Sequence, residues 1–402
     1  MNKGILVLED GEEFPGFLIG APVNSKTILD SSKGNHGKFR DRGYGEVVFN
    51  TSMTGYQEIL TDPSYYGQIV CMTYPHIGNT GVNLEDPESD HPWCAGFLFH
   101  EITEEPSNWR SQGSLVDYLS QNGIPALYGI DTRGLTQHLR SRGVVRGLIL
   151  PWEEKSKAKE LLAQLPSFEG RDLIGEVTTS QSYTWKSKLK DSDPLSPVQN
   201  LKEESKKSFK VVAMDFGAKW NLLQSLDYLG CQVEVVSART TAEEILAMKP
   251  DGLFLSNGPG DPSAAPYAAK TVSQLIGKLP IFGVCMGHQI LALALGARTY
   301  KLKFGHRGGN QPVLDQVTGR VEISSHNHGY AVDGRSLPSN VEVTHMNLND
   351  KTVEGLSVKN AKAFSVQYHP EACPGPHDSM GLFERFVDLM RKHVSEIPRT
   401  HH

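Results

Sequence analysis

Residues 280–296 read PIFGVCMGHQILALALG, and this stretch decides the fold of the C-terminal half. Residues 280–284 are predicted as a buried strand, and residues 288–295 as a helix that stops at Gly296. Between them, Gly283-Val-Cys-Met-Gly287 has the Gly-x-nucleophile-x-Gly form, in which the chain reverses so sharply that the middle residue is strained. The stretch therefore predicts a strand, a tight turn with Cys285 at its tip, and a helix.

Strands and helices alternate on both sides of this stretch. Short apolar runs predict strands at 210–215, 232–236, 252–256, 320–324, 341–345 and 363–368. Helical spacing predicts helices at 220–229, 241–248, 265–276 and 381–392. Because alternating strands and helices build a parallel sheet covered on both faces, the fold class is predicted to be α/β, with a C-terminal doubly wound, mostly parallel sheet.

The first half is less regular and predicts a smaller mixed α and β domain. Residues 5–8 and 12–19 look like a β-hairpin. Further strands are expected at 46–50, 69–73 and 94–99, and short helices at 115–121 and 135–140. Residues 24–43 are rich in Ser, Gly, Lys and Arg and are predicted to be an exposed loop.

A composition break separates the two halves. Residues 181–208 are polar and charged, contain prolines and show no apolar period, so a linker or surface crossing is expected there. The predicted domains are therefore 1–180 and 209–402.

The bulk composition is that of an ordinary globular protein. The 402 residues carry a net charge of −6, which gives no basic surplus for nucleic acid or an anionic membrane surface. The apolar runs are too short to span a bilayer, and the N-terminal residues lack the apolar core of a signal peptide. We therefore expect a cytoplasmic protein that binds neither nucleic acid nor membrane.

The chain has five cysteines, an odd number without CxxC spacing, which argues against a disulfide framework or a cysteine zinc site. Cys285 stands out because it precedes a helix, whose dipole and free N–H groups favour a thiolate. The N–H of Met286 is placed to donate to an oxyanion. A cysteine after a strand is often only a small buried hydrophobe, but the two flanking glycines and the helix favour a nucleophile.

A cysteine nucleophile needs a proton carrier. His369 follows the predicted strand 363–368, at the carboxyl edge where open α/β sheets place their sites. Glu371 is close enough to accept from the second imidazole nitrogen and fix the tautomer. The alternative is a surface histidine beside a solvated glutamate; the cysteine turn favours the catalytic interpretation.

Other motifs are ambiguous taken alone. The turn 257–261, Asn-Gly-Pro-Gly-Asp, either supplies a backbone N–H to an oxyanion or is a plain turn, and no Gly-Lys-Ser/Thr follows to make it a phosphate loop. His326 and His328, with His306 nearby, raise the alternative of a zinc site, but no further ligand shares their spacing. His288 is too close to Cys285 in sequence to act as its base.

These motifs together resemble those of class I, or triad, glutamine amidotransferases: GVCMGHQ at 283–289, HPE at 369–371 and NGPGD at 257–261. The first half resembles the small chains of carbamoyl-phosphate synthetase, through VFNTSMTGYQEILTDPSY at 48–65, TYPHIGN at 73–79 and DTRGLT at 131–136. So do DFGAK at 215–219, KFGHRGGN at 303–310 and QYHPEA at 367–372. The resemblance covers nearly the whole chain.

The resemblance implies that Cys285 forms a thioester with glutamine and that His369 and Glu371 complete the triad. It implies a glutamine site built from both halves, consisting of Ser52, Gly258, Gly260, Met286, Gln289, Asn327, Gly329 and Tyr330. This replaces two interpretations drawn from the residues alone, a structural loop at 49–58 and the zinc site, and no metal is expected.

The resemblance also implies partners. Ammonia passes to a large synthetase chain, which uses ATP, magnesium and bicarbonate to make carbamoyl phosphate for arginine and pyrimidine biosynthesis; this chain itself needs no cofactor. A heterodimer, open to assembly into a higher oligomer, is expected. An amidotransferase feeding anthranilate or nucleotide synthesis would lack the first domain, and a purely regulatory subunit would not need Cys285.

The chain departs from the family pattern at a few positions. Met286 stands where leucine is frequent and Tyr330 where phenylalanine is frequent, and both exchanges keep the side-chain shape. Cys373 stands near the triad where a small polar residue is expected, and we hypothesise that oxidation joins it to Cys285.

Overall fold

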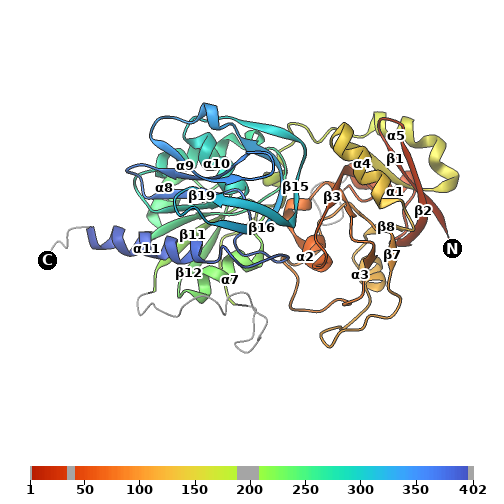
Figure 1. The fold of residues 1–402 in the computed structure, drawn as a ribbon, viewed down its shortest axis with the longest axis horizontal. Helices are drawn as coiled ribbons and strands as arrows, with labels where there is room; N and C mark the ends of the chain where they lie inside the picture. The colour runs from red at the N-terminus through yellow and green to blue at the C-terminus, as the bar shows by residue number, and fades with distance from the viewer. Residues whose placement is uncertain (1, 34–40, 188–207, 397–402) are drawn as a thin grey trace. The chain divides into compact units, whose positions relative to one another are not determined.

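The computed structural model describes residues 2–33, 41–187 and 208–396, and the chain forms two compact units (Figure 1). The first unit consists of Met1–Arg171 and Lys303–Gly308. The second consists of Asp172–Leu302 and Gly309–His402.

The first unit is built on a closed barrel. Its strands follow one another in the order β1 (Lys3–Leu8), β2 (Glu13–Gly20), β8 (Pro125–Tyr128), β6 (Gly96–Leu98), β4 (Gln68–Met72), β3 (Tyr44–Asn50) and β9 (Val145–Pro151). A separate parallel pair consists of β5 (His76–Ile77) and β7 (Glu101–Ile102). The helices are α1 (Ser25–Lys33), α2 (Tyr56–Thr61), α3 (Leu115–Gln121), α4 (Thr132–Arg142) and α5 (Ala158–Gln164). The mixed α and β character and the β1–β2 hairpin are as predicted.

One prediction for this unit is wrong in part. Within the segment 24–43, predicted as a loop, residues 25–33 form helix α1, while residues 34–40 lie outside the described part of the chain. The side chain of Asn24 accepts from the N–H of Thr27 at 2.9 Å, and Ile28 is fully buried. A polar cap and one buried apolar residue thus make a helix that composition alone did not reveal.

The second unit is built on one extended sheet. Its strand order is β10 (Tyr183–Thr184), β12 (Gln232–Ser237), β11 (Lys210–Asp215), β13 (Gly252–Leu255), β14 (Ile281–Val284), β19 (Ala363–Val366), β18 (Val353–Val358), β17 (Val341–Asn347), β15 (Thr299–Asp315) and β16 (Val321–Val332). The run from β12 to β19 is parallel, whereas β10, β18 and β17 pair antiparallel with their neighbours. The predicted doubly wound, mostly parallel core is confirmed.

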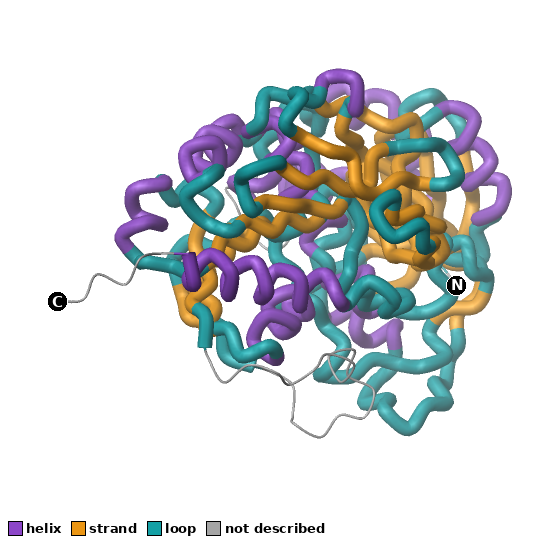
Figure 2. Tube along the Cα trace, turned by 60° about the vertical axis from the view of Figure 1, so that its left-hand side comes forward, coloured by secondary structure: helices purple, strands orange, loops and turns teal. Residues whose placement is uncertain are grey.

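Helices cover both faces of this sheet (Figure 1). They are α6 (Leu173–Val177), α7 (Trp220–Tyr228), α8 (Ala242–Ala247), α9 (Pro266–Leu275), α10 (Met286–Ala294) and α11 (Gly381–Glu396), the last being the purple helix that precedes the C-terminus in Figure 2. Alternate residues of β11 point to opposite sides: Val212 and Met214 join the core under α8, α9 and α10, whereas Val211 and Ala213 join the core under α7 and α11. Burial on both faces explains why the parallel strands appear in the sequence as unbroken apolar runs.

The sequence prediction missed β15 and β18 and found only the start of β16. Strand β15 reads TYKLKFGHRGGNQPVLD and has exposed and half-exposed positions along most of its length, so it shows no apolar run. Strand β18 carries the fully buried Glu354 in its interior, which interrupts an otherwise apolar segment. Both strands lie outside the parallel core, and polar side chains within them hide the apolar pattern of a strand.

The contacts divide the chain at Arg171 and Asp172, ahead of the predicted boundary at residue 180. The segment that follows joins the second unit because β10 pairs with β12 and the hydroxyl of Thr178 donates to the carbonyl oxygen of Asp215 at 2.6 Å. Residues 188–207, most of the predicted linker, lie outside the described residues. Within the described ranges, no helix combines the length and the apolar character needed to cross a bilayer.

Candidate active site

The predicted catalytic side chains gather at one edge of the parallel sheet. Strands β11, β13, β14 and β19 are consecutive neighbours and run parallel, so the segments that follow them emerge at the same edge. The segment after β14 carries Cys285, and the segment after β19 carries His369 and Glu371. The segments after β11 and β13 supply Lys219 and the Asn-Gly-Pro-Gly turn.

Cys285 sits in a strained turn between β14 and α10. Its backbone has φ 54° and ψ −102°, a conformation that L-residues rarely adopt, and its N–H donates to the carbonyl oxygen of Val366 at 2.9 Å. A Cβ atom on Gly283 would lie 2.7 Å from the carbonyl oxygen of Gly287, and one on Gly287 would lie 2.2 Å from that of Leu255. Only glycine fits at both flanks, as the sequence motif predicts.

The turn places the thiol at the start of a helix. Helix α10 begins at Met286, directly after Cys285, so the first N–H groups of the helix face the region of the sulfur. The Sγ atom of Cys285 lies 3.6 Å from the carbonyl oxygen of Asn327, which brings β16 next to the nucleophile. The predicted helix started two residues too late, at 288, because glycine and methionine in its first turn do not signal a helix by themselves.

His369 and Glu371 form a buried pair. The Nδ1 atom of His369 lies 2.7 Å from Oε1 of Glu371, and both residues are buried. The N–H of His369 donates to the carbonyl oxygen of Ser325 at 2.8 Å, and the hydroxyl of Ser325 donates to the carbonyl oxygen of Pro374 at 2.7 Å. Ser325 of β16 therefore holds both ends of the loop that carries the pair, one through its backbone and one through its side chain.

Lys219 is a functional candidate that sequence reasoning did not single out. Its side chain is 2% exposed, and Nζ lies 2.9 Å from Oε1 of Glu371 and donates to the carbonyl oxygen of Ala372 at 2.6 Å. The available signal was its place in the motif DFGAK directly after β11, at the same sheet edge as the triad. A buried ammonium at this point neutralises the carboxylate that faces His369.

Charge interactions shift the pKa values of the pair in opposite directions. Burial lowers the pKa of His369, but the charges of Glu371 and Cys285 outweigh burial and raise it to about 10. Burial raises the pKa of Glu371, but Lys219 and His369 outweigh burial and lower it to about 2. The arrangement therefore favours an ionised carboxylate facing an imidazolium.

The turn after β13 is fixed against the turn after β11. The side-chain oxygen of Asn257 accepts from the N–H of Lys219 at 3.0 Å. A Cβ atom on Gly258 would lie 2.1 Å from the carbonyl oxygen of Phe216, and Gly260 has φ 83°, so glycine is required at both positions. The backbone of this turn is thus rigid, as an oxyanion donor requires.

The remaining residues of the second unit that are predicted to bind the substrate glutamine lie on β16 and α10. Asn327, Gly329 and Tyr330 belong to β16. The amide nitrogen of Gln289 donates to the carbonyl oxygen of Tyr330 at 2.8 Å and to Oε1 of Gln367 at 2.9 Å. Gln289 therefore ties the strand to the helix that starts at the nucleophile.

Ser52 belongs to the first unit, directly after β3. Its N–H donates to the side-chain oxygen of Asn50 at 2.7 Å, and the amide nitrogen of Asn50 donates to the hydroxyl of Tyr65 at 2.7 Å. The loop that carries Ser52 is thus anchored within its own unit, and the contact of Ser52 with glutamine stays a prediction.

His288, set aside as a base in the sequence, lies within the core. It is fully buried, and its Nδ1 atom lies 2.9 Å from the hydroxyl of Ser365. Burial, with a smaller contribution from His345, lowers the pKa of His288 to about 3, so the imidazole is neutral. All five cysteines lie in the described part of the chain, and none of them, Cys285 and Cys373 included, forms a disulfide.

Comparisons with known proteins identify the families that the two halves of the chain resemble. The profile of the carbamoyl-phosphate synthase small chain, CPSase domain, matches residues 6–149, and that of glutamine amidotransferase class-I matches residues 212–389. A carbamoyl phosphate synthase small chain of Syntrophotalea carbinolica is 52% identical over 392 residues, 97% of this chain and 98% of the relative. One from Synechocystis sp. is 52% identical over 401 residues, 98% of each chain. A chloroplastic one from Arabidopsis thaliana is 48% identical over 389 residues, 96% of this chain and 85% of the relative.

Proposed function

This chain belongs to the carbamoyl phosphate synthase small chain family, and on that premise we propose that it hydrolyses L-glutamine to glutamate and ammonia through a cysteine thioester. The observation that carries the proposal is the position of Cys285, in a strained turn at a helix start, on the strand next to the one that leads to the His369–Glu371 pair. A thiol, an imidazole and a carboxylate in this order are the parts of a nucleophilic amide hydrolase.

The first half-reaction forms the thioester. His369 accepts the proton of Cys285, a role that the raised pKa of the imidazole supports. The sulfur attacks the side-chain amide carbon of glutamine, and the electron pair of the carbonyl moves onto oxygen. The N–H of Met286 and one from the turn at Gly258–Gly260 stabilise this oxyanion, each donor lowering the barrier by about 3–4 kcal/mol. When the carbon–nitrogen bond breaks, the imidazolium protonates the leaving ammonia.

The second half-reaction releases glutamate. The imidazole of His369, now neutral, takes a proton from water, and the resulting hydroxide adds to the thioester carbon. The carbon–sulfur bond breaks, the thiolate returns, and the proton stays on His369. Glu371 keeps the imidazole in one orientation through both steps, and Lys219 keeps Glu371 ionised.

The other side chains bind the substrate. We assign glutamine recognition to Ser52, Gln289, Asn327, Gly329 and Tyr330, with the backbone of Gly258, Gly260 and Met286 around the reacting carbonyl. No step draws on a cofactor or metal held by this chain. The ammonia serves a large synthetase chain that uses ATP, magnesium and bicarbonate to make carbamoyl phosphate, for arginine and pyrimidine biosynthesis in the cytoplasm.

Glutamate release from glutamine tests the proposal. The rate is measured for the chain alone and after addition of a large synthetase chain with bicarbonate and ATP. Slow hydrolysis that rises sharply on addition is the expected result for the glutaminase half of a coupled synthetase. Fast hydrolysis that is indifferent to the large chain would keep the triad but reopen the identity of the ammonia acceptor, and no hydrolysis in either condition would overturn the proposal.

A further inference from the structure

A short chain of hydrogen bonds joins the helix that starts at the nucleophile to the loop that carries the base. Gln289 on α10 and Gln367, directly after β19, are both buried. The amide nitrogen of Gln289 lies 2.8 Å from the carbonyl oxygen of Tyr330 and 2.9 Å from Oε1 of Gln367. Gln367 stands just ahead of Tyr368 and His369 in the chain, and the mechanism above gives it no part.

The backbone carbonyl of Tyr330 decides how the amide of Gln289 is turned. A carbonyl oxygen can only accept, so the atom of Gln289 that faces it at 2.8 Å is the nitrogen, because two oxygens at this distance would repel each other. The other hydrogen of this nitrogen points at Gln367, whose amide must therefore present its oxygen. Neither a rotatable hydroxyl nor an imidazole tautomer enters this assignment, so each amide has a single orientation.

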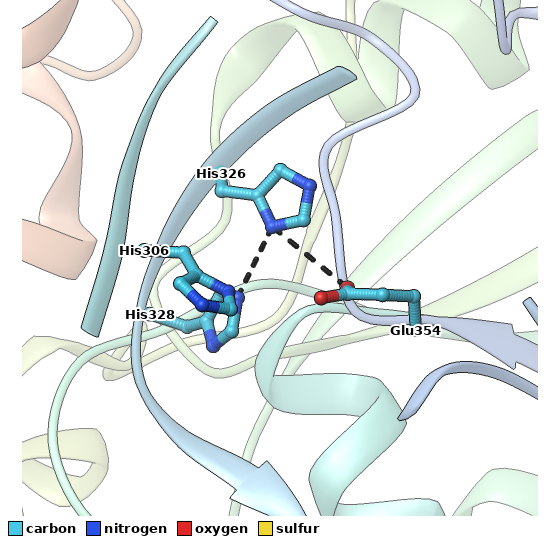
Figure 3. Close-up of side chains that lie close together, drawn as sticks. All are labelled: His306, His326, His328 and Glu354. Carbon is cyan, nitrogen blue, oxygen red and sulfur yellow. Dashed lines mark hydrogen bonds and ion pairs between the residues drawn. The ribbon is translucent and has the colours of Figure 1, made fainter. Parts of the chain in front are cut away.

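Both ends of this chain are held by residues drawn in Figure 3. The Nδ1 atom of His328 lies 2.8 Å from the same carbonyl oxygen of Tyr330. The N–H of Gln367 donates to the carbonyl oxygen of Glu354 at 2.9 Å, and the fully buried side chain of Glu354 lies beside that of His326. These contacts fix the carbonyl at one end and the backbone of Gln367 at the other.

The fixed orientation limits what Gln289 can offer to a substrate. Both hydrogens of its amide nitrogen are engaged within the protein, so only its oxygen, Oε1, remains. This oxygen can accept from an ammonium or an amide N–H, but it repels a carboxylate or a carbonyl oxygen. Glutamine carries two such donors, its α-ammonium and its side-chain amide.

The side chain of Gln367 has a single polar contact within the described residues. Its amide nitrogen is buried and has no protein partner there, and its oxygen accepts from Gln289. A buried amide with one unsatisfied end is costly compared with an apolar side chain of the same shape. The polar end of Gln367 is therefore better explained by its effect on Gln289 than by a contribution to stability.

From these contacts we infer that Gln367 is a positioning residue that sets substrate specificity: it holds the amide of Gln289 with the oxygen available to an N–H donor of the substrate. The inference rests on the proposed function, which assigns Gln289 to glutamine recognition. Because the α-ammonium and the side-chain amide of glutamine share this chemistry, analogues that lack one donor each distinguish them.

The variant Gln367→Met tests the inference, because it removes the acceptor and keeps the length of the side chain. It also removes the unsatisfied amide nitrogen, so the variant should fold, which urea unfolding checks. The value of kcat/KM is measured in the complex with the large chain for glutamine and for two analogues. The first analogue, 4-carbamoylbutanoate, lacks the α-ammonium and releases glutarate; the second, the γ-methyl ester of glutamate, lacks the amide N–H and releases glutamate.

Gln367→Met should lower kcat/KM by about 10-fold or more for glutamine and for one analogue, the effect of weakening one hydrogen bond to a charged or strongly polar donor. The other analogue should be nearly unaffected, and its identity names the donor. If 4-carbamoylbutanoate is unaffected, Gln289 accepts from the α-ammonium; if the ester is unaffected, it accepts from the side-chain amide. Gln289→Met removes the accepting oxygen itself and should give the same pattern with at least as large a loss.

Gln224→Met is the matched control. Gln224 is a buried glutamine on α7 whose amide oxygen accepts from the hydroxyl of Ser187 at 3.0 Å. This variant should leave kcat/KM unchanged for all three substrates.

Two outcomes would overturn the inference without touching the proposed function. Equal losses for the three substrates in Gln367→Met protein would mean that Gln367 only supports the fold around the site, because a structural role does not distinguish donors. No loss for any substrate would mean that the carbonyl of Tyr330 alone orients Gln289. Absence of glutamine hydrolysis by the wild-type complex would overturn the proposed function instead.

Discussion

The second unit buries two centres made of the same side chains, imidazole and carboxylate, and the two carboxylates have different neighbours. At the triad, Glu371 contacts the ammonium of Lys219 as well as His369. At the other centre, Glu354 lies beside His326, a hydroxyl and an amide. In the proposed mechanism, the permanent cation Lys219 lets the imidazole of His369 gain and lose a proton while the Glu371 carboxylate keeps a counter-charge.

The largest expected effect tests whether Cys285 is the nucleophile of the reaction. Cys285→Ser should lower the rate of glutamine hydrolysis by at least about 10⁴-fold while glutamine still binds, because only the nucleophile changes. Glutamate release and titration calorimetry with glutamine measure the two properties. Substantial glutaminase activity in this variant would show that Cys285 is not the nucleophile and that the triad is not the catalytic centre.

Loss of the permanent cation should have the next largest effect. Lys219→Met leaves the fully buried Glu371 without its ammonium, which should lower the free energy of unfolding by about 3–5 kcal/mol and raise the pKa of Glu371. Lys359→Met breaks an exposed pair with Glu342 and should cost no more than about 1 kcal/mol. Urea unfolding of both variants provides the measurement. Equal losses would mean that burial of the cation does not matter.

The strained turn at Cys285 gives a third prediction, because the backbone of this turn positions the nucleophile. Gly287→Ala would bring a Cβ atom to 2.2 Å from the carbonyl oxygen of Leu255, so the turn must shift, at a cost of about 1–3 kcal/mol in stability and with loss of activity. Gly381→Ala at the start of α11 meets no atom within 4 Å and is the control. Wild-type activity in Gly287→Ala would show that the turn tolerates movement.

The smallest expected effect is a change in pH dependence. The pKa of His369 in the folded protein, about 10, exceeds the ordinary histidine value of 6.5, so its contribution to stability is complete below about pH 6.5 and is lost as the pH rises through 10. Glu371→Gln removes the main charge that raises the pKa of His369. In this variant, the contribution of His369 to stability should therefore be lost at a lower pH. The difference in unfolding free energy between the wild type and the variant should therefore shrink as the pH rises toward 10, by at most about 1.4 kcal/mol per unit. A constant difference would contradict the assignment.

The parallel core and the triad were predictable because each leaves a local signal. Strands buried on both faces, such as β11 and β14, must be apolar throughout, and the strained turn at Cys285 admits only glycine at its flanks. His369 could be placed because it follows a strand of that core. These features depend on neighbours in sequence or on a simple rule for sheet edges.

What the sequence did not reveal depends on contacts between distant segments. Lys219 reaches Glu371 because β11 and β19 end at the same edge, and nothing around it in the sequence marks it as buried. Glu354 is the second residue of a mostly apolar strand, and its contacts with His326, Thr352 and Asn347 are made only in the folded chain. The spacing of His326 and His328 raises the alternative of a zinc site, because spacing shows which side chains share a face but not which groups they contact.

The bonds of Ser325 to the loop of His369 have a consequence for regulation. The same strand that carries residues of the predicted glutamine site holds the backbone of His369, so we expect glutamine binding and the alignment of His369 to be coupled. Such coupling is reciprocal: a ligand that orders β16 orders the base, and a contact that orders the base raises the affinity for glutamine by the same factor. A signal from a distant partner would then need to reach only one strand to act on both substrate capture and proton transfer.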